Sequence, residues 1–422
     1  MSQLLGTRAH ANSTVVERLR ASDPVLVDIL PAGEAIPGMT ATTILTSGVP
    51  LSWEDYYGGQ RRAILSAAVY ERLAVSLEEA DHKIQAGEIQ VAFTHDHGCV
   101  GSVAGIYTAS MPVFVVEDRQ HGNRAFCNFY EGESRYRLNY GSYDESVRDG
   151  LLFLQHELAP VLQDAVRRSG GIELKPLIGR ALRMGDELHS RNTAATSLFL
   201  RELVPHLLAM SAEGDLARVT TALNFLQASD YFFLRLSMAA AKASADAADG
   251  VPGSSVVTAM TISCREFAIR VSGLPGQWFR GSLPQADAKL FDGFTMDDME
   301  WIGGESLIAE TVGLGAFAQA AAFGLQAYQG GDAQAMVAMN ESMYAITVSE
   351  HDTYLIPYFG FRGVPLGIDI HRVVDSGIVP LIDGGLTGKA GGQIGAGVLS
   401  APMDCFVAAR SAYAAAYPQH ES

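Results

Sequence analysis

The stretch LKPLIGRALRMGDELHSRNTAATSLFLREL, residues 174–203, joins two helical patterns through an unusually polar centre. On both sides of this centre, apolar residues recur three and four positions apart, which is typical of a helix with one buried face. The centre, MGDELHSRN (184–192), holds two acids, a histidine, an arginine and an asparagine. A helix with a buried apolar face gains nothing from packing so many polar groups. We therefore predict that this stretch lines a pocket that loops from both lobes also line.

Helical spacing places Asp186 and His189 on one face of the predicted helix, at positions i and i+3. A carboxylate beside an imidazole orients the ring and raises its pKa towards neutrality, so this pair is our candidate for acid–base chemistry. Glu187 and Arg191 lie four apart on a neighbouring face, where an ordinary surface ion pair is an equal alternative. Gly185 would let a ligand or another backbone approach closely.

Outward from this stretch, the helical pattern covers residues 145–245 and ends in KASADAADGVPGSS (242–255), whose Gly, Pro and Ser residues predict a linker. Strand-like apolar runs lie on both sides of this block, and one amphipathic helix is predicted at 53–87. We therefore predict a mixed α+β fold, with two α/β lobes and a helical subdomain between them. The predicted domains are an N-terminal α/β lobe (1–144), a helical subdomain (145–245) and a C-terminal α/β lobe (246–422). The predicted strand regions are 24–32, 89–101 (running into a loop), 111–118, 254–273 and 351–386.

The composition excludes several classes of protein. Of the 422 residues, 48% are hydrophobic and 18% are charged, which suits a compact globular chain. The formal net charge of -17 argues against nucleic acid or an anionic membrane as a partner. Four separated cysteines without a CxxC pair, and no signal-peptide pattern, predict reduced thiols and a cytoplasmic location. The uncharged run 311–331, rich in Ala and Gly, is predicted to be a buried helix and not a membrane span.

The triplet His95-Asp96-His97 stands where a predicted strand meets a glycine-rich turn. In an extended strand His95 and His97 share a face, which suits either two metal ligands or a hydrogen-bonding and acid–base site, with a structural polar cluster as the third interpretation. No cofactor is required by the pattern, and a divalent metal at these two histidines stays open. Cys99 beside His97 is the one Cys–His neighbour pair, and a small buried residue explains it better than a catalytic thiol does.

Other polar groups are candidates for binding a substrate. Arg265 and Arg270 lie five apart in a strand-like segment, so they face opposite sides, and one of them could grip a carboxylate or phosphate. The segment DGGLTGKAGGQIGAG (383–397) reads as an anion-binding loop or a multi-turn connection, without the spacing of a nucleotide-binding motif. The candidates in these segments and in HGNRAF are Asn123, Arg124, Lys389, Gln393 and Gly395.

Three stretches, HDHGCVGSVAGIYTASMPVFVVED (95–118), the quoted 174–203 and GQIGAGVLSAPMDCF (392–406), resemble the AllG-type family. This family includes one subunit of bacterial oxamate carbamoyltransferase, and the resemblance runs from about Val25 to Ala409. It implies a mixed α and β architecture with a helical subdomain. Asp96 and Cys99 depart from the family pattern of three histidines and an asparagine in that segment, so the substrate stays open. The pocket that the resemblance implies comprises His95, His97, Asn123, Asp186, Glu187, His189, Arg191 and Asn192.

The implied reaction transfers a carbamoyl group between phosphate and the amide nitrogen of oxamate. An amide nitrogen is a poor nucleophile, so the site must accept a proton and stabilise an oxyanion. We expect His189 with Asp186 to do the first, and Arg191, Arg265 or the N–H groups around Gly395 to do the second or to hold the anions. The expected partners are a small anionic or amide substrate and companion subunits or further copies of the chain.

Two other functions remain open from the sequence. One is a stand-alone amidohydrolase or C–N lyase that acts on a small amide or ureido compound and does not require phosphate. The other is a non-catalytic binding or scaffold subunit, which would bind ligand or partners without turnover.

Overall fold

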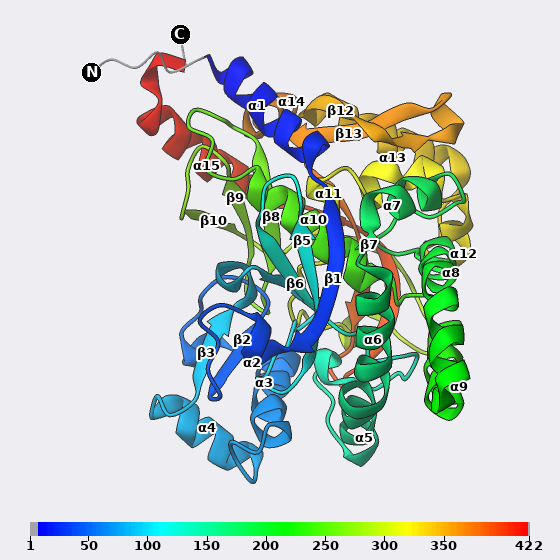
Figure 1. Cartoon of the computed structure of the whole chain (residues 1–422). Helices are drawn as coiled ribbons and strands as arrows, with labels where there is room; N and C mark the ends of the chain where they lie inside the picture. The colour runs from blue at the N-terminus through cyan, green and yellow to red at the C-terminus, as the bar shows by residue number, and fades with distance from the viewer. Residues whose placement is uncertain (1–6, 421–422) are drawn as a thin grey trace.

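The computed structural model describes residues 7–420. Its largest sheet has five strands in the order β4, β6, β5, β1, β7 (Figure 1). β1 pairs antiparallel with both β5 and β7, whereas the short β4 pairs parallel with β6. The strands predicted at 24–32 and 111–118 are confirmed. The bounds are β1 Pro24–Pro31, β4 Cys99–Val100, β5 Pro112–Asp118, β6 Arg124–Asn128 and β7 Ile172–Glu173.

Helix α10 (Leu234–Ala247) packs against β5 and β6 and is buried over most of its length. Every residue from Leu234 to Ala245 is buried, and six of its fourteen residues are alanines. Small side chains let a helix approach a sheet closely, which explains an alanine-rich helix in the interior. The lysine and aspartate of KASADA therefore lie within this helix, and the predicted linker is confined to the residues after it.

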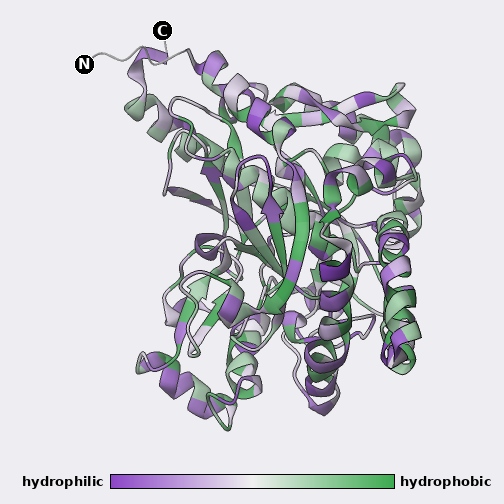
Figure 2. Ribbon diagram, viewed as in Figure 1, coloured by the Kyte–Doolittle hydropathy of each residue, from purple (hydrophilic) through white to green (hydrophobic). Residues whose placement is uncertain are grey.

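The helical block predicted at 145–245 is present, on the right of Figure 1. In α6 the apolar residues face the sheet and the charged ones face outward, because they recur with the helical period. Figure 2 shows this contrast between the hydrophilic outer face of α6 and the mostly hydrophobic β1 and β5. The bounds are α5 Glu145–Phe153, a π-helical turn Leu154–Leu158, α6 Ala159–Ser169, α7 Leu174–Leu182, α8 Thr193–Met210 and α9 Leu216–Gln227.

The segment between β1 and β4 forms a small unit of its own, at the lower left of Figure 1. Its strands β2 (Thr43–Thr46) and β3 (Gln90–Phe93) pair parallel. The single helix predicted at 53–87 is wrong, because the chain forms α3 (Gly58–Tyr70) and α4 (Leu77–Gln85). Between them Arg72 has φ 63°, and the Ser76 side chain caps α4 by accepting the N–H of Glu79.

The C-terminal half contains two three-stranded antiparallel sheets and one long hairpin. Helix α15 packs on β9 and β10, and helix α1 near the other end of the chain packs on the hairpin. The bounds are α1 Arg8–Ala21, β8 Val257–Ile262, β9 Phe267–Val271, β10 Trp278–Gly281, β11 Gln285–Leu290, α13 Ala333–Ile346, β12 Thr347–Ile356, β13 Arg362–Ile368, α14 Ile370–Ser376, β14 Leu381–Thr387, β15 Gln393–Ser400 and α15 Met403–Ala416.

Residues 183–192 are not helical, and the helix predicted through them is wrong. Helix α7 ends at Leu182 and α8 begins at Thr193. Between them, Gly185 has φ 103° and Leu188 has φ 71°, and a right-handed helix contains neither conformation. Asp186 and His189 therefore share no helix face.

The run 311–331 is largely buried, as predicted, but it is not one helix. It is divided among α11 (Ile308–Thr311), two 3₁₀ helices (Gly315–Ala321 and Phe323–Leu325) and α12 (Gln326–Gln329). Gly313 and Gly315 both have positive φ, which breaks the helix. None of the helices described in residues 7–420 has both the length and the apolar character needed to cross a membrane.

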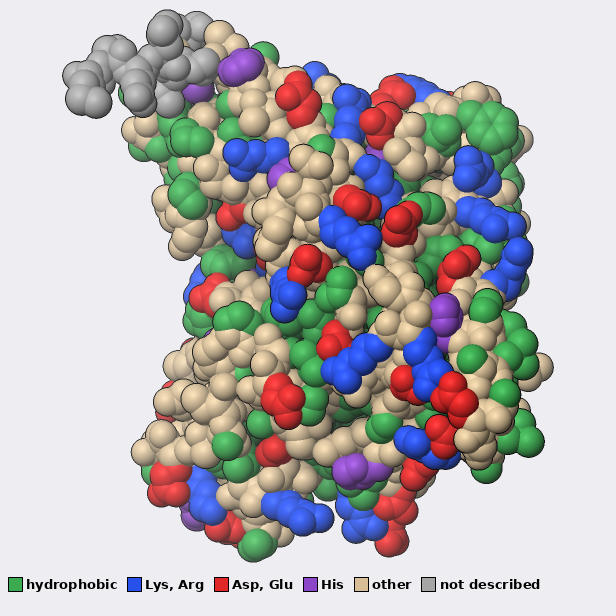
Figure 3. Space-filling model, viewed as in Figure 1, with side chains coloured by type: hydrophobic (Ala, Val, Ile, Leu, Met, Phe, Trp, Pro, Cys, Tyr) green, Lys and Arg blue, Asp and Glu red, His purple; other side chains and the backbone are tan. Residues whose placement is uncertain are grey.

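The mixed α+β fold class is confirmed, with helices and small sheets alternating through the chain. One cluster of buried apolar residues runs from Ala11 to Leu366, and a second surrounds β8, β9, β14 and β15. The three predicted domains thus share core contacts, and their boundaries stay a prediction. On the face in Figure 3, acidic and basic side chains are interspersed.

Candidate functional site

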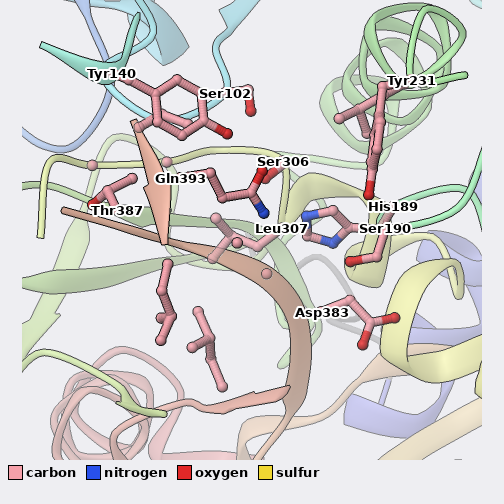
Figure 4. A pocket seen from close by; sticks show the side chains of 18 of the residues that line it. Ser102, Tyr140, His189, Ser190, Tyr231, Ser306, Leu307, Asp383, Thr387 and Gln393 are labelled. Atoms are coloured by element: carbon pink, nitrogen blue, oxygen red, sulfur yellow. The ribbon is translucent and has the colours of Figure 1, made fainter. Parts of the chain in front are cut away.

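A cavity of about 460 Å³ brings together segments that are far apart in the sequence. Its walls come from residues 130–140, the non-helical segment 183–192, the start of α10 and the β14–β15 hairpin. Figure 4 shows His189, Ser190 and Asp383 grouped on one side, with the Tyr231 hydroxyl pointing towards them. The volume lies in the range typical of small-molecule sites.

The backbone of segment 183–192 is held by the Glu187 side chain. Its carboxylate accepts the N–H groups of His189 (3.1 Å), Ser190 and Arg191 (2.9 Å). Such a cradle compensates for the left-handed conformation of Leu188, which an isolated chain disfavours. As a result, His189 and Ser190 both line the cavity.

His189 forms a buried pair with Glu310 of α11. Its Nδ1 lies 2.8 Å from Glu310 Oε1, which also accepts the N–H groups of Ala316 and Asp383. Burial alone would lower the pKa of His189, but the charges of Glu310 and Glu187 and the hydrogen bond to Glu310 raise it above 6.5. With Nδ1 engaged, Nε2 is the ring nitrogen left to exchange a proton with a ligand.

Glu187 and Asp383 are two buried carboxyl groups that interact electrostatically, and each accepts hydrogen bonds from neighbouring N–H groups. Like charges so close in the interior favour the protonated form of at least one of the two groups. Burial and the charge of Glu310 raise the pKa of Asp383 to about 7, and burial and Asp383 raise that of Glu187. Two glutamines, Gln319 and Gln329, also donate to Asp383 Oδ1.

Aromatic side chains, among them Tyr231, Tyr328, Tyr130 and Tyr140, line the cavity between these acidic residues and a group of arginines. The rings of Tyr231 and Tyr328 are in tilted contact, with centroids 6.3 Å apart, and Gln393 donates to the Tyr328 hydroxyl. Beyond them the guanidinium of Arg137 stacks over the Tyr130 and Tyr140 rings. Two further arginines line the cavity: Arg235 at the start of α10, and the exposed Arg135, which lies over the Phe294 ring.

Of the residues singled out in the sequence, His189 and Gln393 line the cavity, and Glu187 reaches it through Asp383. Asp186 is fully buried beside α8, where its carboxylate accepts the N–H of Ala195 at 2.8 Å. Asn192 donates to the His189 carbonyl oxygen, and Arg191 Nε donates to that of Gly185. The carboxylate that orients His189 is therefore Glu310 and not Asp186, whose contact is that of a helix cap.

The histidines of HDHGCVG lie outside the cavity walls. Residues 94–97 form a 3₁₀ turn and not a strand, so the shared strand face predicted for His95 and His97 is wrong. His95 is buried beside Trp278 and has no hydrogen-bond partner at either ring nitrogen, and His97 Nδ1 is 2.8 Å from the Pro37 carbonyl oxygen. Across residues 7–420, no group of three or more His, Cys, Asp or Glu side chains is arranged to hold a metal ion.

The other predicted anion-binding residues have protein partners elsewhere. Arg270 pairs with Asp246 and Asp249, in a buried cluster that also contains Lys242. Arg265 donates to the Asp55 carbonyl oxygen, precedes β9 and is not part of a strand.

Three further candidates also lie away from the cavity. Asn123 donates to the Ala243 carbonyl oxygen, and Arg124 forms an exposed pair with Glu117. Lys389 is exposed and donates to the Asp297 carbonyl oxygen.

The glycine-rich segment 383–397 is a β-hairpin over most of its length, so the prediction of an anion-binding loop there is wrong. β14 and β15 pair antiparallel, and Gly395 sits in β15 opposite Leu290 on one side and Leu386 on the other. A Cβ at Gly395 would lie 2.7 Å from the Lys289 carbonyl oxygen, so close strand packing explains this glycine.

The sequence reasoning missed Glu310, Asp383, Arg137 and Arg235. Glu310 and Asp383 are lone acids within apolar runs, LIAETVGL and VPLIDGGL, and an isolated acid in a buried element is the signal that could have revealed them. Arg235 carries the same signal, as the one charged residue of the apolar run YFFLRLSMAAA, whereas Arg137 stands in the polar run GESRYRLNYGS and carries none.

The chain is similar to a family of known sequences. A family described as "Oxamate carbamoyltransferase subunit AllG" matches residues 89–306. The chain belongs to this AllG family, as the resemblance implied.

Two Escherichia coli K12 proteins are similar over nearly the whole chain. The uncharacterized protein YahG is 40% identical over 407 residues, which cover 96% of this chain and 86% of YahG. Oxamate carbamoyltransferase subunit AllG is 36% identical over 411 residues, which cover 96% of this chain and 97% of AllG. The crystal structure of a conserved protein of unknown function from Enterococcus faecalis V583 has a TM-score of 0.93 and 35% identity, and covers 97% of this chain and 98% of that one.

Proposed function

We propose that this chain is a subunit of a carbamoyl-transferring enzyme and that the reaction takes place in the cavity beside His189 and Asp383. The observation that carries the proposal is the meeting of two buried proton-binding pairs, His189–Glu310 and Glu187–Asp383, at one side of that cavity. Perturbed acid–base groups gathered in an enclosed site are the usual mark of a catalytic one. Membership of the AllG family supports the choice of carbamoyl transfer.

In the proposed reaction the amide nitrogen of a small acceptor, such as oxamate, attacks the carbamoyl carbon of carbamoyl phosphate. The new C–N bond forms, the C–O bond to phosphate breaks, and the nitrogen loses one proton. Neutral His189, with Nδ1–H held by Glu310, accepts that proton at Nε2, and the Glu310 carboxylate stabilises the resulting imidazolium. Burial raises the pKa of Asp383 to about 7, so its protonated carboxyl group donates a hydrogen bond to the carbonyl oxygen as that oxygen gains negative charge.

The protein partners in this proposal are companion subunits. The E. coli relative is named a subunit of oxamate carbamoyltransferase, so we expect full turnover only when the companion chains are present. Further copies of this chain are the alternative partner.

The test is a carbamoyl-transfer assay on the chain reconstituted with its companion subunits. Oxamate and carbamoyl phosphate are supplied, and release of phosphate is followed. We expect His189→Gln and Glu310→Gln each to lower kcat, the former by about a hundredfold or more, as general-base loss does. Asp186→Asn is the matched control, because its carboxylate caps α8 and lies outside the cavity walls. Full activity of His189→Gln would refute the proposed role.

The same assay separates the alternatives. An amidohydrolase would turn over its amide without phosphate or arsenate. A binding subunit would leave the rate of the reconstituted enzyme unchanged when His189 and Asp383 are replaced, and only its affinity for ligand would fall.

A further inference from the structure

Three arginines line the cavity, and the two that are not exposed, Arg137 and Arg235, form no ion pair with a carboxylate in the described part of the chain. Arg235 is only 4% exposed; its Nη1 donates to Asn128 Oδ1 at 2.9 Å, and its Nε has no partner. Arg137 is half-buried between the Tyr130 and Tyr140 rings, at 5.3 and 4.6 Å from their centroids, and its Nε also has no partner. Within residues 7–420, neither guanidinium lies in an ion pair with a carboxylate.

A buried arginine elsewhere in the chain does have acidic partners. Arg270, comparably enclosed, lies between Asp246 and Asp249. The acids nearest Arg137 are already engaged: Glu131 accepts the N–H groups of Leu138 and Asn139, and Glu133 accepts the Tyr130 hydroxyl. The charges of Glu131 and Glu133 raise the pKa of Arg137, but neither carboxylate forms an ion pair with it. The unpartnered Nε–H donors of Arg137 and Arg235 are therefore free to bind an anion from outside the chain.

We propose that Arg137 and Arg235 form an oxyanion subsite of this cavity, which binds the phosphate or carboxylate group of a small ligand. Guanidinium groups suit this purpose because their N–H donors match the spacing of such oxygens. The identity of the anion, phosphate or the carboxylate of an amide acid, rests on the proposed function; the existence of the subsite does not.

The position of the subsite also fixes how a ligand is oriented. Glu187, Asp383 and Glu310 form the acidic side of the cavity and repel an anionic group, whereas the arginines attract it. A ligand with one anionic end and one neutral amide end therefore places its amide towards His189. The charges of the cavity wall therefore fix the orientation of the bound ligand.

The experiment measures anion binding to the full chain by isothermal titration calorimetry, with inorganic phosphate and with oxamate as separate probes. We expect saturable binding of at least one probe at millimolar concentration, and affinity at least tenfold weaker in Arg137→Met and in Arg235→Met. Arg265→Gln is the matched control, because it removes an arginine that lies over Tyr57, away from the cavity. We expect it to bind as the unmodified chain does.

The two variants protect the test against misfolding. Arg235→Met also loses the contact with Asn128, so its fold is checked by circular dichroism. Arg137→Met loses the contact of the guanidinium with the Tyr130 and Tyr140 rings, and it carries the test if Arg235→Met does not fold. The subsite is refuted if neither probe binds the unmodified chain, or if both folded variants bind as tightly as it does.

Competition identifies the natural anion. If oxamate displaces phosphate, the subsite holds the carboxylate of the acceptor; if the two bind together, it holds phosphate. Binding that depends on the arginines, in a chain without carbamoyl turnover, would refute the proposed function and leave the subsite standing. Carbamoyl turnover without arginine-dependent binding would refute the subsite and leave the proposed function standing.

Discussion

The raised pKa of Asp383 makes a prediction that requires no knowledge of the substrate. Replacing Asp383 by Asn keeps an oxygen that accepts from Gln319 and Gln329, and it supplies an N–H in place of the carboxyl proton. The variant therefore resembles the protonated form of native Asp383. The free energy of unfolding of the variant should lack the pH dependence that Asp383 contributes to that of the native chain.

The expected magnitude follows from the shift in the pKa of Asp383, from 3.8 to about 7. Because the folded state binds the proton more tightly, the native protein has this stabilisation in full below pH 3.8 and loses it as the pH rises to about 7. At 1.36 kcal/mol per pKa unit, the loss is on the order of 4 kcal/mol. The free energy of unfolding of Asp383→Asn should therefore rise, relative to the native chain, by up to about 4 kcal/mol between pH 4 and pH 8.

Urea unfolding at a series of pH values measures this difference. Glu305, whose pKa burial also raises to about 7, is present in both proteins and cancels in the comparison. Asp332→Asn is the control, since Asn caps a helix as well as Asp does and Asp332 is the cap of α13. Parallel pH curves for Asp383→Asn and the native chain would show that the pKa of Asp383 is not raised.

Three further predictions test neighbouring features. In Glu310→Gln, the pKa of His189 should fall below 6.5, because burial then outweighs the remaining charges; a titration of the labelled imidazole by NMR, assigned with His189→Gln, would contradict this if the pKa did not move. Asp186→Ala should destabilise the chain by about 1–2 kcal/mol through loss of the α8 cap, whereas Asp186→Asn should cost little, and equal thermal stability of the two variants would argue against capping. A thiol reagent should label the native chain slowly and the urea-unfolded chain completely, because all four cysteines are buried; rapid native labelling would show that one is accessible (Cys99, Cys127, Cys264, Cys405).

Much of the secondary structure could be predicted from the sequence because its signals are local. β1 and β5 are short apolar runs bounded by turns, and the helices of 145–245 show the helical period. The turn at 183–192 could not be predicted in this way. It depends on a leucine in a left-handed conformation, which the Glu187 carboxylate stabilises by accepting neighbouring N–H groups.

The candidate site shows the same division. His189 and Glu187 could be singled out because they stand in a dense polar stretch. Glu310, the partner of His189, is 121 residues away along the chain, and only folding brings the two together. The sequence therefore predicted the histidine of the pair and assigned it the wrong carboxylate. A single sequence contains no measure of such distant proximity.

Helix α10 has a mechanical consequence for this protein. Arg235, near its first residue, faces the cavity, and Lys242 and Asp246, near its last, belong to the buried ion cluster with Arg270. Its fourteen residues form a rod about 21 Å long, packed on all sides and unable to bend without opening the core. A ligand that moved Arg235 along the helix axis would therefore also move Lys242 and Asp246, and with them the salt bridge that joins Arg270 of β9 to the helix.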